Sequence, residues 1–171
     1  MKPITLFAAV LLIAPAVAAQ APVAAPAEMG KLTFLVGEWR GEGWMVGQAG
    51  RQTFTQGERV LRLADGHVVV VEGLGKNAAG VTIHQAFAVI SYDAASAKFT
   101  MRTFRAADGS WRDNELTLSE RGFVWGFPTP QGQVRFTMNL TDAGQWHEVG
   151  EFSMDGATWR QFLDFTLTKQ P

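Results

Sequence analysis

The chain has 171 residues, a formal net charge of −1 and no cysteine. This length suits one domain of ordinary size, and the lack of cysteine excludes disulfides, thiolate catalysis and cysteine-based zinc or iron–sulfur sites. With 18 Gly, 12 Phe and 6 Trp, the composition favours an all-β protein, and the lack of a basic patch argues against nucleic acid as a partner.

The N-terminus has the features of an export signal. Lys2 supplies the charged start, residues 4–14 are apolar but too short to span a bilayer, and small residues follow. We expect cleavage near Ala19, which makes 1–19 a signal peptide and leaves a periplasmic or secreted protein with no membrane span after processing. Residues 20–29, rich in Ala and Pro, predict a flexible leader, and 30–171 form a single domain.

Residues 34–44 read FLVGEWRGEGW, so Trp39, Gly41 and Gly43 fall at every second position. Alternate residues of a strand share a face, and glycine in a strand marks a bend or a close backbone approach. The pattern predicts a first barrel strand that curves over a plugged end. An ordinary edge strand with a single Trp is the alternative.

The rest of the chain predicts ten strands and almost no helix beyond a short helical turn at 29–35. Short connections with Gly or Asp-Gly signals separate the strands, and such a meander closes most naturally into an antiparallel up-and-down barrel. An open two-sheet sandwich is the rival arrangement. The expected strands are 36–46, 50–63, 67–75, 81–92, 98–106, 110–118, 122–128, 132–140, 145–153 and 158–168.

Pairing these strands through their turns predicts which face lies inside. Two-residue turns at 108–109, 121–122, 131–132 and 155–156 keep one mostly apolar face on the same side through six strands. If Tyr92 pairs with Phe99, His84 joins that face. The phase of 50–63 and 67–75 stays open, because residues 68–71 are apolar on both faces.

The pattern at Gly37, Trp39, Gly41 and Gly43 resembles the calycin superfamily of lipocalins, fatty-acid-binding proteins and nitrobindins. More closely, it is similar to bacterial secreted lipocalin-like proteins of a domain family without an assigned function, and segments 91–93, 125–127, 146–148 and 158–161 fit this resemblance. The resemblance implies a barrel that binds a small molecule and names no ligand.

The predicted interior divides into an aromatic plug and a polar mouth. An apolar cavity with a few placed polar groups is the usual form of a small-molecule site, and guanidinium groups favour an anionic head group. We therefore expect a small hydrophobic or amphipathic ligand, such as a fatty acid. The plug residues are Trp39, Tyr92, Trp146 and Phe165; the ligand-binding candidates are His84, Arg105, Arg112, Asn114, Trp125, Glu148 and Gln161.

Several of these residues also have a plain structural interpretation. Arg105 and Arg112 flank a turn, where charges are commonly solvated, and His84 suits a hydrogen-bonded structural role. Glu148 faces apolar residues, which is costly unless its carboxyl group is paired; it either pairs with an inward arginine or lies on a strand that is one residue out of phase.

Heme is the alternative ligand, because nitrobindins use this barrel with a proximal histidine on the last strand. Residues 159–167 contain no histidine, His147 faces outward and His67 sits at a turn, so only His84 could ligate iron from inside. We therefore expect no cofactor.

Other functions remain open. His147-Glu148 does not complete a zinc motif, so we expect no metal site and name no catalytic residues. An enzyme that moves a proton with His84 and Glu148 is one alternative. An envelope interaction module with a contact surface around Trp44 or Trp111 is another. We expect a monomer or homodimer.

Overall fold

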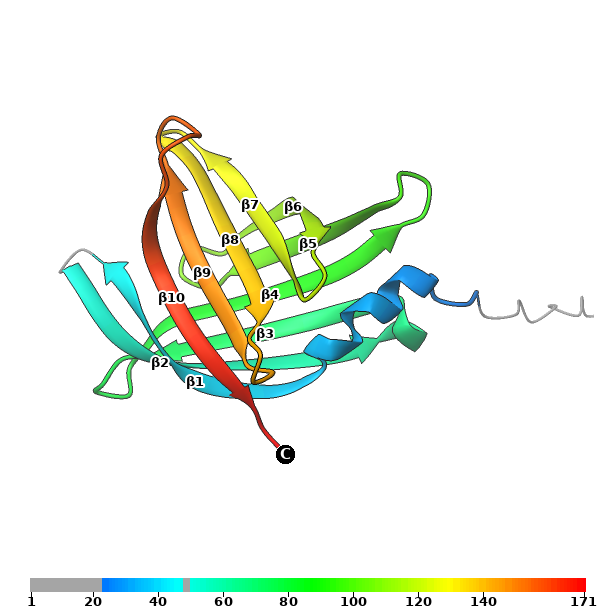
Figure 1. Cartoon of the computed structure of the whole chain (residues 1–171), viewed down its shortest axis with the longest axis horizontal. Coiled ribbons are helices and arrows are strands. Elements are labelled where there is room, and N and C mark those ends of the chain that lie inside the picture. The colour runs from blue at the N-terminus through cyan, green and yellow to red at the C-terminus, as the bar shows by residue number, and fades with distance from the viewer. Residues whose placement is uncertain (1–22, 48–49) are drawn as a thin grey trace, which may run out of the picture.

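The computed structural model describes residues 23–47 and 50–171. These described residues form ten antiparallel strands in one closed barrel, where neighbours along the chain pair and β1 also pairs with β10 (Figure 1). The arrangement confirms the predicted up-and-down barrel and excludes the open sandwich. The strands are β1 (Gly37–Gly47), β2 (Gly50–Leu63), β3 (Val68–Lys76), β4 (Thr82–Asp93), β5 (Lys98–Arg105), β6 (Ser110–Leu118), β7 (Gly122–Thr129), β8 (Gly132–Leu140), β9 (Trp146–Ser153) and β10 (Arg160–Lys169).

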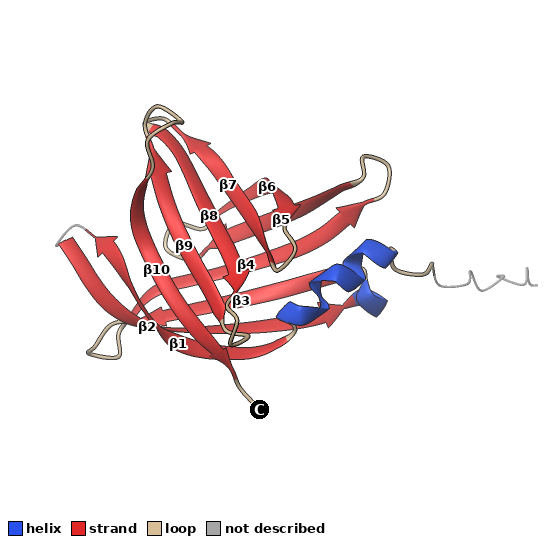
Figure 2. Cartoon of the chain, viewed as in Figure 1, coloured by secondary structure: helices blue, strands red, loops and turns tan. Residues whose placement is uncertain are grey.

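A 3-10 helix, η1 (Ala27–Leu35), lies at one end of the barrel and contacts β3 and β4. Figure 2 shows how little helix accompanies the strands; the other helical turn, η2 (Ala64–Gly66), joins β2 to β3. The side chains of Met29, Leu32 and Leu35 are fully buried, so η1 closes this end of the interior.

The helix begins inside the segment 20–29 that the composition predicts to be a flexible leader. The folded domain therefore starts at Ala27 rather than at residue 30, because Met29 belongs to the core. The expected signal peptide, 1–19, lies outside the described residues. Within 23–47 and 50–171, no helix has the length and apolar character needed to cross a membrane.

Strand β1 runs close against β10, because two of its inner-face positions carry no side chain. A Cβ atom on Gly41 would overlap the carbonyl oxygen of Thr166, and one on Gly43 would overlap the carbonyl oxygen of Asp164. Trp39, on the same face, is buried and donates a hydrogen bond of 2.7 Å from Nε1 to the Leu35 carbonyl oxygen. The Trp-x-Gly-x-Gly pattern thus sets β1 against β10 and joins it to η1.

Four hairpins differ from the prediction in register, and the last of them, β9–β10, is displaced in the opposite sense and contains a bulge that is described below. A two-residue turn at 108–109 would place Arg105 opposite Arg112, whereas Arg105 pairs with Ser110. The hairpins β6–β7 and β7–β8 are displaced by two residues in the same sense. A shift of two residues leaves every side chain on its original face, so the inner face predicted for β5 to β8 is the inner face observed.

The closed end of the interior is a layer of aromatic and aliphatic side chains beneath η1. Trp39 and Trp146 meet edge to face with ring centroids 5.8 Å apart, and Phe123 packs against Trp146 at 6.3 Å. Trp39, Trp146 and Phe165, three of the expected plug residues, are buried, and Tyr92 is half-buried against Phe99. This layer positions the polar groups of the next layer, described below.

Candidate functional site

The interior toward the open end has two unlike walls. One wall is built of small residues: Gly73 and Gly75 on β3 pair with Ala86 and His84 on β4, and Gly41 lies on the same inner face of β1. The opposite wall is aromatic and comes from β7, β8 and β10. This asymmetry sets partly exposed rings on one side of the interior and glycines of β3, which make room for inward side chains of β2, on the other.

Four half-buried rings form the aromatic wall. Trp125 stacks on Phe136 with centroids 4.4 Å apart and an angle of 14° between the planes. Phe127 lies 6.0 Å from Trp125, and Phe162 meets Phe136 edge to face at 5.7 Å. Aromatic groups that stay partly exposed on a concave face are typical of small-molecule sites.

Two glutamates lie in the middle layer of the interior. Glu58 on β2 pairs with Trp39, and Glu148 on β9 pairs with Phe165; both residues are only 9% exposed. Burial raises the pKa of Glu58 to about 8, opposed by a hydrogen bond from Gln56 and assisted by the charge of Glu148. Burial also raises the pKa of Glu148 to about 7, opposed by the hydrogen bond that Trp146 donates to it.

Two buried amides beside this layer have an oxygen without a partner. Gln56 is 3% exposed and donates from Nε2 to Glu58 Oε1 at 2.6 Å, while its Oε1 accepts no hydrogen bond. Asn114 is 5% exposed and donates from Nδ2 to the Met101 carbonyl oxygen at 3.0 Å, while its Oδ1 is likewise unpartnered. A buried acceptor without a donor costs about 1–3 kcal/mol, so both oxygens are suited to a guest with N–H or O–H groups.

The sequence prediction did not include Gln56 or Glu58, because the phase of β2 stayed open. A usable signal was present in the glycines of the next strand. Gly73 lies opposite Glu58, and Gly75 lies opposite Gln56. Glycine on one strand facing a polar residue on its neighbour indicates a large inward side chain that needs the space.

The expected polar mouth is only partly as predicted. Arg105 is exposed and forms an ion pair with Asp108, three residues further along the chain. Arg112 is also exposed, with its guanidinium carbon 3.9 Å from the centroid of Phe127 and no carboxylate partner among the described residues. His84 lies partly buried on the inner face, where burial and then the charge of Arg105 lower its pKa. Arg112 is therefore the mouth cation that remains available to an anion.

Gln161 does not face the interior as predicted. The ladder between β9 and β10 contains a bulge between Gln161 and Leu163, so Gln161 lies opposite Glu151, on the outer face. Its amide nitrogen donates to Asp164 at 2.7 Å, and the side chain is exposed. The extra residue of the bulge brings Phe162 to the aromatic wall in its place.

The barrel wall is weakest between β6 and β7. Their ladder covers only three pairs, from Leu116 with Trp125 to Leu118 with Phe123, and the two strands diverge beyond it (Figure 1). Arg112 on β6 lies over Phe127 on β7 on the far side of this ladder. A contact between a guanidinium group and a ring thus joins the two strands where ladder pairing has ended.

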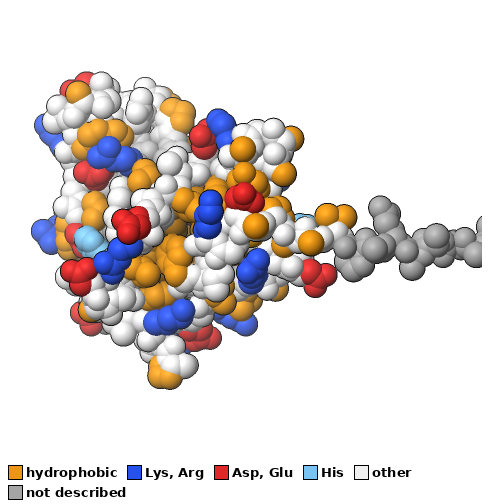
Figure 3. Space-filling view, turned by 45° about the vertical axis from the view of Figure 1, so that its right-hand side comes forward, with side chains coloured by type: hydrophobic (Ala, Val, Ile, Leu, Met, Phe, Trp, Pro, Cys, Tyr) orange, Lys and Arg blue, Asp and Glu red, His pale blue; other side chains and the backbone are white. Residues whose placement is uncertain are grey.

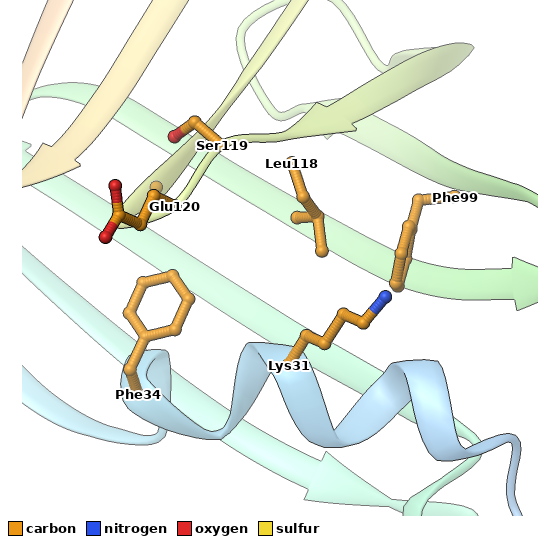
Figure 4. Close-up of a pocket in the computed structure, with 7 residues that line it drawn as sticks. Lys31, Phe34, Phe99, Leu118, Ser119 and Glu120 are labelled. Atoms are coloured by element: carbon orange, nitrogen blue, oxygen red, sulfur yellow. The ribbon is translucent and has the colours of Figure 1, made fainter.

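Two hollows open on the surface of the barrel. A crevice of about 460 Å³ lies between η1 and the β6–β7 turn. Figure 4 shows Lys31 extending toward Phe99 and Leu118 in this crevice, while Phe34 faces Glu120. The second hollow, of about 790 Å³, is lined by residues of β1 to β3, among them Gln56 and Glu58, together with acidic and basic residues of the outer face. Figure 3 shows one face of the molecule, where hydrophobic side chains reach the surface between scattered single charges.

The positions of the histidines and acidic residues bear on metal and heme chemistry. Within 23–47 and 50–171, no group of three or more His, Asp or Glu residues is arranged to hold a metal ion. His147 is 3.2 Å from Asp164, which lies on the outer face, and His67 is 2.8 Å from the Val23 carbonyl oxygen near η1. His84 is the histidine that the strand register places on the inner face.

Comparisons with known proteins bear on the fold. No family model and no curated protein matches the chain. Among solved structures, the chain is similar to that of Rv2717c from M. tuberculosis, with 11% sequence identity, a TM-score of 0.62, and coverage of 87% of this chain and all of that one. At this level of identity the likeness shows a shared barrel fold and carries no statement about ligand or activity.

Proposed function

We propose that the protein is an exported small-molecule-binding barrel, whose interior holds one hydrophobic or amphipathic molecule. The observation that carries this proposal is the set of half-buried, mutually packed rings of Trp125, Phe127 and Phe136 on the inner face of β7 and β8. A barrel that served only as a structural unit would bury such rings fully under other side chains, because protein interiors pack densely. The apolar body of the guest lies against the rings, where each buried Å² contributes about 25 cal/mol.

An anionic group on the guest lies at the mouth, near Arg112. This guanidinium has no carboxylate partner among the described residues, and it rests on Phe127 at the end of the aromatic wall. Arg105 contributes less than predicted from sequence, because Asp108 neutralises it. Export remains part of the proposal on the strength of the N-terminal sequence.

Native mass spectrometry of the protein taken directly from its host tests whether a guest is present. Calorimetry with decanoate then tests where in the barrel the anionic group of a guest binds. We expect Arg112→Ala to weaken decanoate binding about tenfold, the size of one lost charge-assisted contact. Lys31→Ala, which removes the cation of the crevice beside η1, serves as the matched control and should leave the affinity unchanged. Loss of affinity in Lys31→Ala alone, or no binding by the wild type, would overturn the proposal.

A further inference from the structure

The two buried glutamates occupy a prepared place in the barrel. A Cβ atom on Gly73 would lie 2.9 Å from Glu58 Oε1 and 3.0 Å from Glu58 Oε2, and a Cβ atom on Gly75 would lie 2.7 Å from Gln56 Oε1. All three distances are shorter than ordinary van der Waals contact. The β3 wall is therefore shaped around a carboxyl group and an amide, in a region where an apolar core would place aliphatic side chains.

The hydrogen bonds in this cluster leave a surplus of acceptors. Trp146 donates from Nε1 to Glu148 Oε2 at 2.9 Å, and Gln56 donates to Glu58 Oε1. The indole N–H of Trp39 is already used by the Leu35 carbonyl oxygen. Among the described residues, the buried Gln56 Oε1 has no hydrogen-bond donor. When the two carboxyl groups are ionised, Glu58 Oε2 and Glu148 Oε1 accept from no described donor either. The ionised cluster can therefore accept several N–H bonds from a cationic group.

No basic side chain of the barrel supplies that group. Among the described residues, neither Glu58 nor Glu148 forms an ion pair with Lys, Arg or His. On β1 and β2, the strand alternation places Arg40 and Arg59 on the outer face, away from Glu58. The acids are thus not one half of an internal salt bridge, the usual arrangement for a buried carboxylate.

The surroundings of the acids suit a cation. Trp39 and Trp146 stand edge to face beside them, and Phe54 meets Phe165 at 6.3 Å. Ring faces attract ammonium groups, and the attraction grows when water is excluded. Aromatic rings and carboxyl oxygens together form the kind of environment that retains an organic cation.

We propose that Gln56, Glu58 and Glu148 form a subsite for a primary or secondary ammonium group at the inner end of the guest. The inference rests on the proposed binding function and deepens it by naming the chemistry of the buried end. An incoming ammonium group donates to the unpartnered oxygens and makes the carboxylate forms favourable. Protons carried by the empty pair near neutral pH are then released on binding.

Calorimetry at pH 7.5 with guests of equal chain length tests the subsite. We expect decylamine to bind wild-type protein at least about tenfold more tightly than decanol, because only the amine combines charge with several N–H donors. Repeating the amine titration in buffers of different ionisation enthalpy should show proton release, and decanol should show none. Equal affinities for amine and alcohol, or no proton release with the amine, would overturn the inference while leaving the proposed function intact. Failure of decanol, decanoate and the amine to bind would instead overturn the proposed function.

Isosteric variants locate the effect. Glu58→Gln and Glu148→Gln keep the volume of each side chain but remove its charge and one acceptor oxygen, so each should remove most of the preference for amine over alcohol. Glu72→Gln is the matched control, since Glu72 is an exposed glutamate on neighbouring β3. A preference for the amine that survives both inner substitutions would contradict the assignment. Decanol binding reports that each variant still folds around its interior.

Discussion

Glu58 and Glu148 project into one interior from strands that do not pair with each other. Strands β1 and β10 separate them, and Trp39 and Phe165 stand as their respective cross-strand partners. Burial raises the pKa of Glu58, and the charge of Glu148, acting across the interior, raises it further. This relationship makes the ionisation of the pair a property of the folded barrel.

The stability of the barrel should fall as pH rises from about 4.5 to about 8. The pKa of Glu58 rises from 4.5 to about 8 on folding, and that of Glu148 from 4.5 to about 7. In this window the unfolded chain loses protons that the folded barrel keeps, so ionisation favours unfolding. Urea denaturation at pH 5 and pH 8 measures the effect, which should be on the order of a few kcal/mol at about 1.4 kcal/mol per pKa unit.

The variant Glu58→Gln is the control for this prediction. It replaces the titratable carboxyl group by an amide and keeps the side-chain volume. Its free energy of unfolding should therefore vary less with pH, and at pH 8 it should exceed that of the wild type. Below pH 4.5 the two proteins should be similar, because Glu58 is protonated in both the folded and unfolded wild type. A wild type that grows more stable between pH 5 and pH 8 would contradict the burial of the pair.

The space beside Glu58 predicts the effect of a single methyl group. Gly73→Ala would place its Cβ within 3.0 Å of both Glu58 carboxyl oxygens, and overpacking of this kind costs about 1–3 kcal/mol. Gly57→Ala is the matched control on the paired strand, since its Cβ would approach only the Trp39 carbonyl oxygen, at 3.7 Å. Chemical denaturation compares the two variants. Adding Glu58→Ala to Gly73→Ala should recover part of the loss, whereas purely additive effects would show that the two residues do not interact.

The sequence predicts the barrel well because its signal repeats in every strand. Alternation of inner and outer residues survives a register error of two, so Trp125 reaches the interior even though the hairpins on both sides of β7 are displaced by two residues from the prediction. The predicted register of β8 with β9, which places Glu148 opposite Met138, is the register observed. Only half of the acid subsite was predicted from the sequence. The apolar run 68–71 does not reveal which side chains of β3 point inward, and therefore does not reveal which side chains of β2 do so. A bulge adds one residue to one strand alone. The alternation of apolar and polar residues in the sequence therefore does not show that Gln161 points outward.

Trp39 should couple the barrel to η1 through its indole N–H. In Trp39→Phe, the Leu35 carbonyl oxygen loses its donor in a buried setting, which costs about 1–3 kcal/mol. Trp39→Ala should cost about 3–5 kcal/mol, since it also leaves a cavity in the core. Free energies of unfolding from denaturant titrations measure both. Trp111→Phe, at a residue that is 62% exposed, is the control, and an equal loss there would show that the Trp39 effect is not specific to its burial.

The loop between β9 and β10 should depend on Asp155. Its carboxylate accepts hydrogen bonds from the backbone N–H groups of Ala157 and Thr158, at 2.9 and 2.7 Å, and from the Ser153 hydroxyl group. These bonds hold the pKa of Asp155 well below its usual range, so its contribution to stability is present above pH 3.8 and is lost as the pH falls below that value. The same bonds replace the two-residue turn that Asp155-Gly156 predicts, because a side chain that caps its own loop supports a longer connection.

We expect Asp155→Ala to have a lower melting temperature than the wild type at pH 7. The difference between the two melting temperatures should become smaller as the pH falls toward 2. Asp142→Ala is the control, because Asp142 pairs with Arg121 in a fully solvated position and such pairs contribute little. Thermal unfolding followed by circular dichroism measures both variants. Since the loop precedes the bulge that brings Phe162 to the aromatic wall, a loosened loop should also weaken decanol binding. An Asp155→Ala protein with unchanged melting temperature and unchanged affinity would show that β10 finds its register without the loop.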